Sequence, residues 1–325
     1  MTAETTANTA GDTAAADPAG TAPAPTGAAP RTMSYPRALV KLARPKQWAK
    51  NVLVFAAPLA AGALREPGVI GRTAVAFVAF SLAASGTYFI NDALDHTADR
   101  LHPKKKHRPI AAGLVRPRAA ILWGIVLLAA ALAVSVPISG GRLTLVVGVY
   151  LALTVFYSTK GKQIPIVELA AVAAGFVIRA IAGGVAAQVP LSEWFLIVAS
   201  FGSLFMVAGK RHAEISDLGT DGATHRAVLV HYSTAFLGQV RTMAMAVTVT
   251  GYGLWAFGGS NLTVKNAWIF QLSMVPFVLA LLRYAMLVDQ GRGGAPEEVV
   301  LSDRALQLYG LLWVVVFAIG VAARG

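Results

Sequence analysis

The sequence contains no cysteine and few charged side chains. With 0 cysteines in 325 residues, disulfides, thiolate metal sites and cysteine nucleophiles are excluded. Charged residues make up only 14% of the chain and hydrophobic residues 56%, a balance outside the range of soluble domains. Long apolar stretches recur along the chain, so the composition predicts a protein that lies largely within a lipid bilayer.

Acidic residues are also scarce, since 16 Asp and Glu are set against 28 Lys and Arg, which gives a net charge of +12. The basic residues lie between apolar segments and not along one polar face, so they indicate membrane topology, and no nucleic acid partner is expected. Only a few of them fall on the predicted outer side, namely Arg65, Arg72, Arg142, Lys265 and Arg324. This imbalance predicts a cytoplasmic N-terminus, and the longer, more polar inner loops predict a functional site on the cytoplasmic side.

The predicted fold class is all-α, a polytopic bundle of nine transmembrane helices. Residues 1–32 consist mainly of Ala, Thr, Pro and Gly, a composition typical of a disordered tail, and residues 33–325 are expected to form the transmembrane catalytic domain. Apolar runs of roughly 17 to 25 residues are long enough to span a bilayer. Such runs lie near 47–64, 73–92, 119–137, 143–159, 165–187, 192–210, 240–257, 267–287 and 305–323.

The second apolar run ends in three regularly spaced carboxylates, Asp92, Asp95 and Asp99, with Asn91 beside them. On a continuous helix the i, i+3, i+7 spacing places these carboxylates within roughly 60° of one another. Carboxylates this close repel one another unless a cation neutralises them, and Mg²⁺ prefers carboxylate and phosphate oxygens. The pattern therefore predicts a magnesium site at Asp92, Asp95 and Asp99, while a solvated acidic helix end is the alternative.

A basic stretch follows the acids directly and ends in Lys106, His107 and Arg108 before Pro109. Carboxylates for a metal beside cations for phosphate are the groups that a metal-bound diphosphate requires. Lys106 and Arg108 are therefore the predicted phosphate contacts. Anchoring of the basic stretch to anionic lipid is an alternative that is compatible with this function.

The pattern from Asn91 to Gly113, NDxxDxxxD followed by a basic stretch that ends in Arg-Pro-Ile, resembles the first signature of the intramembrane prenyltransferase superfamily typified by UbiA. The resemblance covers nearly the whole chain after the tail. Within the superfamily, the segments 44–51, 178–184 and 205–211 are similar to a branch of phosphoribosyltransferases. The family's second acidic motif, DxxxD, is replaced here by a segment that contains Lys210, Arg211 and Glu214.

The resemblance implies an Mg²⁺-dependent transfer of 5-phosphoribose from 5-phosphoribosyl 1-diphosphate to a polyprenyl phosphate such as decaprenyl phosphate. It implies catalytic roles for Asn91, Asp92 and Asp95, and a multi-pass enzyme of the bacterial plasma membrane that supplies cell-wall arabinan precursors. The basic replacement of the second acidic motif suits a donor that carries a further phosphate. Lys210, Arg211 and Glu214 are therefore predicted to bind substrate.

Further polar groups stand at the ends of, or within, apolar segments. Lys46, Gln47, Lys50 and Asn51 open the first run, and the two amides favour substrate contact because unpaired amides gain nothing from lipid. The lysines alone are also explained by snorkelling to the interface. The resemblance adds Tyr157 and Lys160 to the substrate-binding candidates, although an interfacial aromatic with a flanking cation is a common structural feature.

Glu168 and Arg179 are ionisable residues in the fifth apolar run. Eleven residues place them on almost the same helix face about 16 Å apart, too far for a direct ion pair. Ionisable residues at membrane depth usually face a cavity or a partner. Both are candidate substrate-binding residues, and a structural tie to helix carbonyls is the alternative for Arg179.

Two rival functions remain open on the sequence. One is a superfamily member that transfers a prenyl group from a prenyl diphosphate to an aromatic acceptor at the same acids. The other is a lipid-binding or transport protein that performs no chemistry. The sequence also leaves open whether the protein forms a homo-oligomer within the membrane lipids.

Overall fold

A computed structural model describes residues 33–103, 105–218, 227–258, 266–292 and 296–323. These residues form helices, turns and loops without any β-strand, in agreement with the predicted all-α class. Contacts divide the chain into Met1–Ser34 and Tyr35–Gly325, and the description below concerns the second unit. The predicted disordered tail, 1–32, lies outside the described residues.

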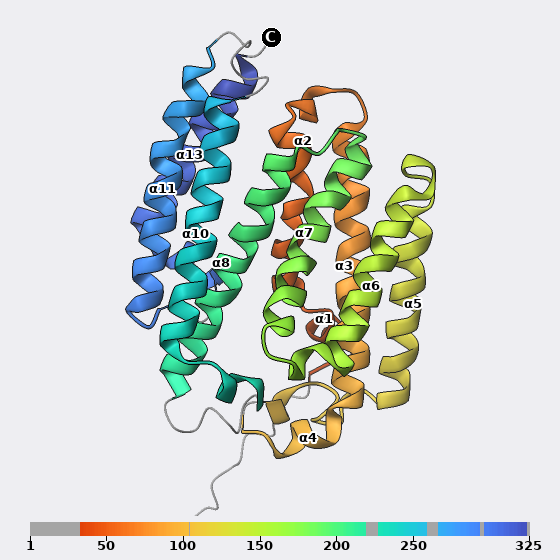
Figure 1. Cartoon of the computed structure of the whole chain (residues 1–325). Helices are drawn as coiled ribbons and strands as arrows, with labels where there is room; N and C mark the ends of the chain where they lie inside the picture. Colours follow the sequence, from red (N-terminus) through yellow and green to blue (C-terminus); the bar gives the residue numbers. More distant parts are fainter. Residues whose placement is uncertain (1–32, 104, 219–226, 259–265, 293–295, 324–325) are drawn as a thin grey trace, which may run out of the picture. The chain divides into compact units, whose positions relative to one another are not determined.

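The first half of the second unit contains short helices as well as long ones. In chain order its elements are α1 (Tyr35–Ala43), η1 (Pro45–Phe55), α2 (Ala56–Ala60), η2 (Ala63–Arg65), α3 (Val69–Leu94), α4 (His96–Leu101), η3 (Lys105–His107), α5 (Pro117–Ser135), η4 (Ser139–Gly141), α6 (Arg142–Thr159) and η5 (Gly161–Gln163). Helices α3 and α5 pack along each other (Figure 1).

The second half consists mainly of long helices. Its elements are α7 (Val167–Ala187), α8 (Glu193–Leu218), η7 (Ala227–His231), α10 (Thr234–Phe257), α11 (Trp268–Asp289), α12 (Pro296–Ser302) and α13 (Arg304–Ala322). Helix α8 packs along α10, α11 packs along α13, and α7 contacts α8 (Figure 1).

Seven of the described helices are long and apolar enough to cross a membrane: those that begin at Val69, Pro117, Ser139, Val167, Glu193, Trp268 and Arg304. They correspond to seven of the predicted runs. Helix α10 matches an eighth run and has 24 residues, but Gln239, Arg241 and several Thr and Gly residues lower its mean hydropathy. The total of nine spans therefore stays a prediction.

The first predicted run, 47–64, is not one continuous α-helix. It folds as the 3-10 helix η1 followed by the short α2 and η2. Pro58 within the run explains part of this, because the proline ring clashes with the preceding helical turn, and Gly62 has a left-handed backbone with φ 76° between α2 and η2. The segment packs directly on α7, where a Cβ atom on Gly183 would lie 1.7 Å from the Val54 carbonyl oxygen. Glycine at position 183 thus permits the close backbone contact, as expected of small residues in membrane helices.

Polar connections gather at one end of the helices. Because successive long helices run in opposite directions, the end of α3, the start of α7 and the end of α8 lie at the end where α4 appears in Figure 1. Buried apolar residues such as Phe80, Val147 and Tyr150 hold α3, α6 and α7 together. An aromatic cluster with Tyr252, Phe270 and Phe317 joins α10, α11 and α13. The packed helices thus provide a rigid support for the polar end.

Candidate active site

The three predicted metal ligands do not form one helical stripe. Helix α3 ends at Leu94, Asp95 separates it from α4, and Asp95 has non-helical backbone angles of φ −86° and ψ 1°. Asp92 and Asp99 are buried, with 4% and 3% of their surfaces exposed, whereas Asp95 is exposed. The break at Asp95 therefore brings the first and third carboxylates together and leaves the second at the surface.

One guanidinium group bridges the two buried carboxylates. Arg108 Nη1 donates to Asp92 Oδ1 at 3.0 Å and to Asp99 Oδ2 at 2.7 Å. The side chain of Arg108 is 28% exposed, so water reaches the cation but hardly reaches the acids. Arg108 was predicted to contact phosphate, and here it lies directly at the acidic motif.

A second arginine, Arg44, was not among the predicted site residues. Its Nη2 donates to Asp92 Oδ1 at 2.7 Å and to Oδ2 at 3.0 Å, and its guanidinium lies 4.4 Å from the centre of the Tyr88 ring. Arg44 has a left-handed backbone with φ 50° just before Pro45, where the α-helical region is disfavoured. No spacing in the sequence links residues 44 and 92, because only tertiary packing brings them together.

A second polar cluster joins the start of α7 to the end of α8. Arg211 Nε and Nη2 donate to the two carboxylate oxygens of Glu168 at 2.9 Å each, and Arg211 Nη1 donates to Glu214 at 2.6 Å. Glu168 is fully buried and Arg211 is 3% exposed. Lys210 lies 3.8 Å from Glu214 and keeps 39% of its side chain exposed. The predicted substrate-binding residues Glu168, Lys210, Arg211 and Glu214 are thus brought together.

Tyrosines adjoin this second cluster. The Tyr232 hydroxyl accepts a hydrogen bond from the Ile166 backbone at 2.6 Å. Burial is the main cause that raises the pKa of Tyr232 above its ordinary value, and Glu168 and Tyr157 act in the same direction. Lys160 is exposed and belongs to the connection between α6 and α7. The predicted pair Tyr157 and Lys160 therefore lies at the same end of the helices as Glu168.

Arg179 and Asn51 form a separate buried network. Arg179 donates to Asn51 Oδ1 at 2.7 Å, to the Gly175 carbonyl at 2.7 Å and to the Tyr150 hydroxyl at 2.9 Å. Asn51 in turn donates to Ser81 at 3.0 Å. Arg179 thus connects α7 to η1 and α6, which matches the structural alternative. Glu168 pairs with Arg211 and not with Arg179.

The remaining candidates have local partners. Lys50 donates to Gln47 at 2.6 Å, a pairing that follows from 3-10 geometry because residues i and i+3 then lie one above the other. Lys46 and Lys50 would share one face of an α-helix, but the segment is a 3-10 helix. Asn91 donates to Ser158 at 3.3 Å, whereas Lys46 and Lys106 are exposed.

Two of the three carboxylates of the acidic motif lie close enough together to share a ligand. Within the described residues, no group of three or more His, Cys, Asp or Glu side chains is placed to hold a metal. Asp92 and Asp99, however, each have an oxygen within 3.0 Å of the same atom, Arg108 Nη1. Mg²⁺ is commonly bound through one or two carboxylates together with substrate phosphates. The pair Asp92 and Asp99 meets that requirement, with Asp95 outside it.

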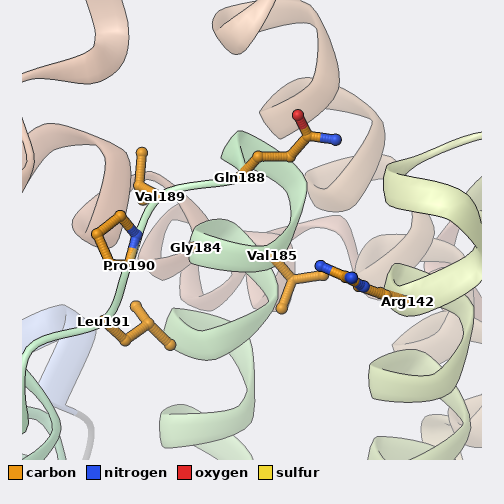
Figure 2. A pocket seen from close by; sticks show the side chains of 7 residues that line it. All are labelled: Arg142, Gly184, Val185, Gln188, Val189, Pro190 and Leu191. Carbon is orange, nitrogen blue, oxygen red and sulfur yellow. The ribbon is translucent and has the colours of Figure 1, made fainter.

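A hollow of about 720 Å³ lies at the opposite end of the helices (Figure 2). Arg142, at the start of α6, and Gln188, just after α7, line it together with apolar residues such as Val185 and Leu191. Helix α6 runs towards the acidic motif and α7 runs away from it, so the start of α6 and the end of α7 are both far from Asp92. The length of these helices therefore separates the hollow from Asp92. None of the predicted site residues lines it.

Comparisons with known proteins agree with this geometry. The chain is 48% identical over 279 residues to a decaprenyl-phosphate phosphoribosyltransferase of Corynebacterium glutamicum, covering 85% of this chain and 84% of that protein. It is 46% identical over 288 residues to the Mycobacterium tuberculosis protein of that name, covering 87% and 94%.

The fold is similar to a solved UbiA homologue from Archaeoglobus fulgidus bound to DMAPP and Mg²⁺, with a TM-score of 0.66 and 18% identity over 88% of this chain and 98% of that chain. At that identity the similarity concerns the fold alone. Residues 52–311 match the model of the UbiA prenyltransferase family. The matched segment contains the second polar cluster and the acidic motif with Arg108, but not Arg44. The chain therefore belongs to the UbiA prenyltransferase family.

Proposed function

We propose that this chain transfers 5-phosphoribose from 5-phosphoribosyl 1-diphosphate to decaprenyl phosphate or a similar polyprenyl phosphate and releases diphosphate. The observation that carries the proposal is the identity of 46% and 48% to decaprenyl-phosphate phosphoribosyltransferases over more than four fifths of the chain. The composition of the second polar cluster supports it as well. Lys210 and Arg211 stand where the superfamily's second acidic motif is expected, and cations there suit a phosphate group in place of a second metal.

The donor's diphosphate would bind at the acidic motif. Mg²⁺ held by Asp92 and Asp99 would supply positive charge to the departing diphosphate. Arg108 and Arg44, which now pair with these acids, would turn towards the phosphate oxygens when the metal neutralises the carboxylates. Asn91 flanks the pair and would add a neutral contact to the ligand.

The transfer step requires positioning more than proton transfer. An oxygen of the lipid phosphate attacks C1 of the ribose, the C1–O bond to diphosphate breaks, and the leaving diphosphate takes the electron pair. The attacking phosphate is already ionised at neutral pH, so no general base is needed. Holding the two reactants in line lowers the barrier by removing their relative motion before the reaction. Lys210 and Lys160 would orient the lipid phosphate, and Arg44 and Arg108 the diphosphate, while the buried Arg211 would hold α7 and α8 together through Glu168.

The proposal includes a defined topology: nine spans, a cytoplasmic N-terminus, and an active site at the cytoplasmic face of a bacterial plasma membrane. The uneven distribution of Lys and Arg supports it. Because the chain has no cysteine, single cysteines introduced at Ala98 and at Gly140 can each be labelled uniquely in intact cells. A membrane-impermeant reagent should label the variant at position 140 alone. Labelling of the variant at position 98 from outside would reverse the orientation.

One assay separates the proposal from its rivals. Purified protein in lipid nanodiscs is incubated with Mg²⁺ and either 5-phosphoribosyl 1-diphosphate plus decaprenyl phosphate, or a prenyl diphosphate plus an aromatic acceptor, and diphosphate release and lipid products are followed. We expect turnover with the first pair and a phosphoribosylated lipid. Turnover with the second pair alone would establish the aromatic prenyltransferase. Absence of turnover with both pairs would favour a lipid-binding or transport protein. A role in cell-wall arabinan synthesis would then be tested by depleting the protein and measuring arabinan.

A further inference from the structure

A second hollow differs from the one in Figure 2 in both chemistry and position. It is a groove of about 440 Å³ between α7, α8 and α10, and apart from Ser200 its lining side chains are apolar. Helix α7 is one of the seven helices apolar enough to span a membrane. The groove therefore lies at the depth of the bilayer, and none of the substrate-binding candidates lines it.

Small side chains on α7 create this groove. Ala170, Ala173 and Ala174 all line it, and their spacing of three and four residues places them on one face of the helix. The opposite wall carries larger side chains, including Phe201 of α8 and Phe236 of α10. Because the alanines end at Cβ, they leave a channel along α7 that larger residues would fill.

The groove has a direction. Its lining begins at Ile166 and continues along α7 to Ile178, a length of about 18 Å for twelve helical residues. At the Ile166 end it meets the second polar cluster, since the Ile166 backbone donates to Tyr232 and the Tyr232 ring stacks on Phe236 with 5.9 Å between ring centres. Tyr232 in turn lies close enough to Glu168 and Arg211 for both charges to affect its pKa.

Charge at the polar end favours an anionic head group. Arg211 and Lys210 face the carboxylates of Glu168 and Glu214, so this set alone is neutral. Lys160 and Lys162 lie in the connection that leads into α7, and the helix η5 in that connection packs against both α7 and η7. These two lysines make the polar end positive overall, which complements a phosphate group.

We propose that this groove binds the first isoprene units of the acceptor lipid, with its phosphate at the polar end near Lys210 and the Ile166 turn. The inference rests on the proposed function and adds where the lipid chain lies. The groove is too short for a whole polyprenyl chain, so the distal units continue into the bilayer past Met243, which is 51% exposed at the rim. A single chain with a phosphate head fits a channel that is apolar along its length and positive at one end.

Filling the groove at two heights tests this assignment. Ala170→Phe would block it near the head group and Ala174→Phe about 6 Å further along. The acceptors are decaprenyl phosphate and geranyl phosphate, whose short chain ends before the distal part of the groove. We expect Ala174→Phe to raise the KM for decaprenyl phosphate about tenfold, with a much smaller change for geranyl phosphate. Ala170→Phe should raise the KM for both acceptors.

The matched control is Ala152→Phe, because Ala152 is an exposed alanine on α6 and does not line the groove. It should match the wild type with both acceptors, and all variants should elute as the wild type does in size-exclusion chromatography. Equal KM values for decaprenyl phosphate in Ala174→Phe and the control would overturn the inference. The inference would also be overturned if Ala174→Phe lost co-purified phospholipid, or changed its oligomeric state, without a change in the KM for decaprenyl phosphate. Failure of the wild type to transfer phosphoribose to either acceptor would refute the proposed function itself.

Discussion

The two polar clusters at the same end of this protein contain similar residues in different environments. At the acidic motif, buried carboxylates face arginines whose side chains are 28% and 30% exposed. In the second cluster, Arg211 and Glu168 are both buried, with 4% and 0% of their side chains exposed. Partly exposed cations exchange partners readily. Removal of one partner of a fully buried ion pair, in contrast, lowers the free energy of unfolding strongly, because the other charge is left buried without a partner. The first cluster is therefore suited to ligand exchange and the second to holding α7 and α8 in place.

The largest effect that this contrast predicts is on stability. Arg211→Met should leave Glu168 buried without its cation and lower the free energy of unfolding by about 3 to 5 kcal/mol. The measurement is thermal unfolding in detergent with Arg118→Met as the control, because Arg118 is an exposed arginine. The double variant Arg211→Met with Glu168→Met should recover much of the loss. An Arg211→Met protein as stable as the control would remove the distinction between the clusters.

The next largest effect is on activity at the acidic motif. Asp92→Asn should lower kcat by about 10²- to 10³-fold, the range for removal of one group that stabilises developing charge, and should weaken the response to Mg²⁺. Asp99→Asn should behave similarly because both carboxylates meet at Arg108. Asp95→Asn should have a clearly smaller effect, since Asp95 is exposed. A magnesium titration of the three variants measures this, and three equal losses would restore the original three-carboxylate site.

Arg44 gives a smaller effect that tests whether the first cluster exchanges partners. Arg44→Lys keeps the charge but loses the two-pronged contact with Asp92. We expect the KM for 5-phosphoribosyl 1-diphosphate to rise about tenfold, as for the loss of one charge-assisted hydrogen bond, with little change in unfolding temperature. A large drop in unfolding temperature with an unchanged KM would make Arg44 a structural residue like Arg211.

The smallest effect concerns an ion pair away from both clusters. Hydrogen bonding from Arg283 is the main cause that lowers the pKa of Asp303 from 3.8 to about 2. A carboxyl group with a depressed folded pKa contributes stability above its unfolded pKa, and this contribution is lost as pH falls from about 4 to about 2. The difference in unfolding temperature between wild type and Asp303→Asn should therefore be present at pH 6 and shrink through that window. A difference independent of pH would show that Asp303 does not stabilise the fold through its charge.

Much of this architecture could be predicted from the sequence, because membrane helices follow from local composition. Seven predicted apolar runs correspond to long apolar helices, and Asp92, Asp99, Arg108, Glu168 and Arg211 were all among the predicted site residues. The failures have local causes as well. Pro58 and Gly62 interrupt the first run, and the helix break at Asp95 turns a predicted stripe of three acids into a buried pair.

Composition and neighbouring residues along the chain are enough to establish a helical, cysteine-free protein with an acidic motif followed by cations. Which charges pair depends on the packing of the helices. Arg44 pairs with Asp92 across 48 residues, and Arg211 pairs with Glu168 across 43. The apolar groove on α7 likewise exists only where three helices pack around its alanines. Contacts of this kind depend on the positions and angles at which helices pack. The order of hydrophobic and charged residues along one helix does not specify these positions and angles.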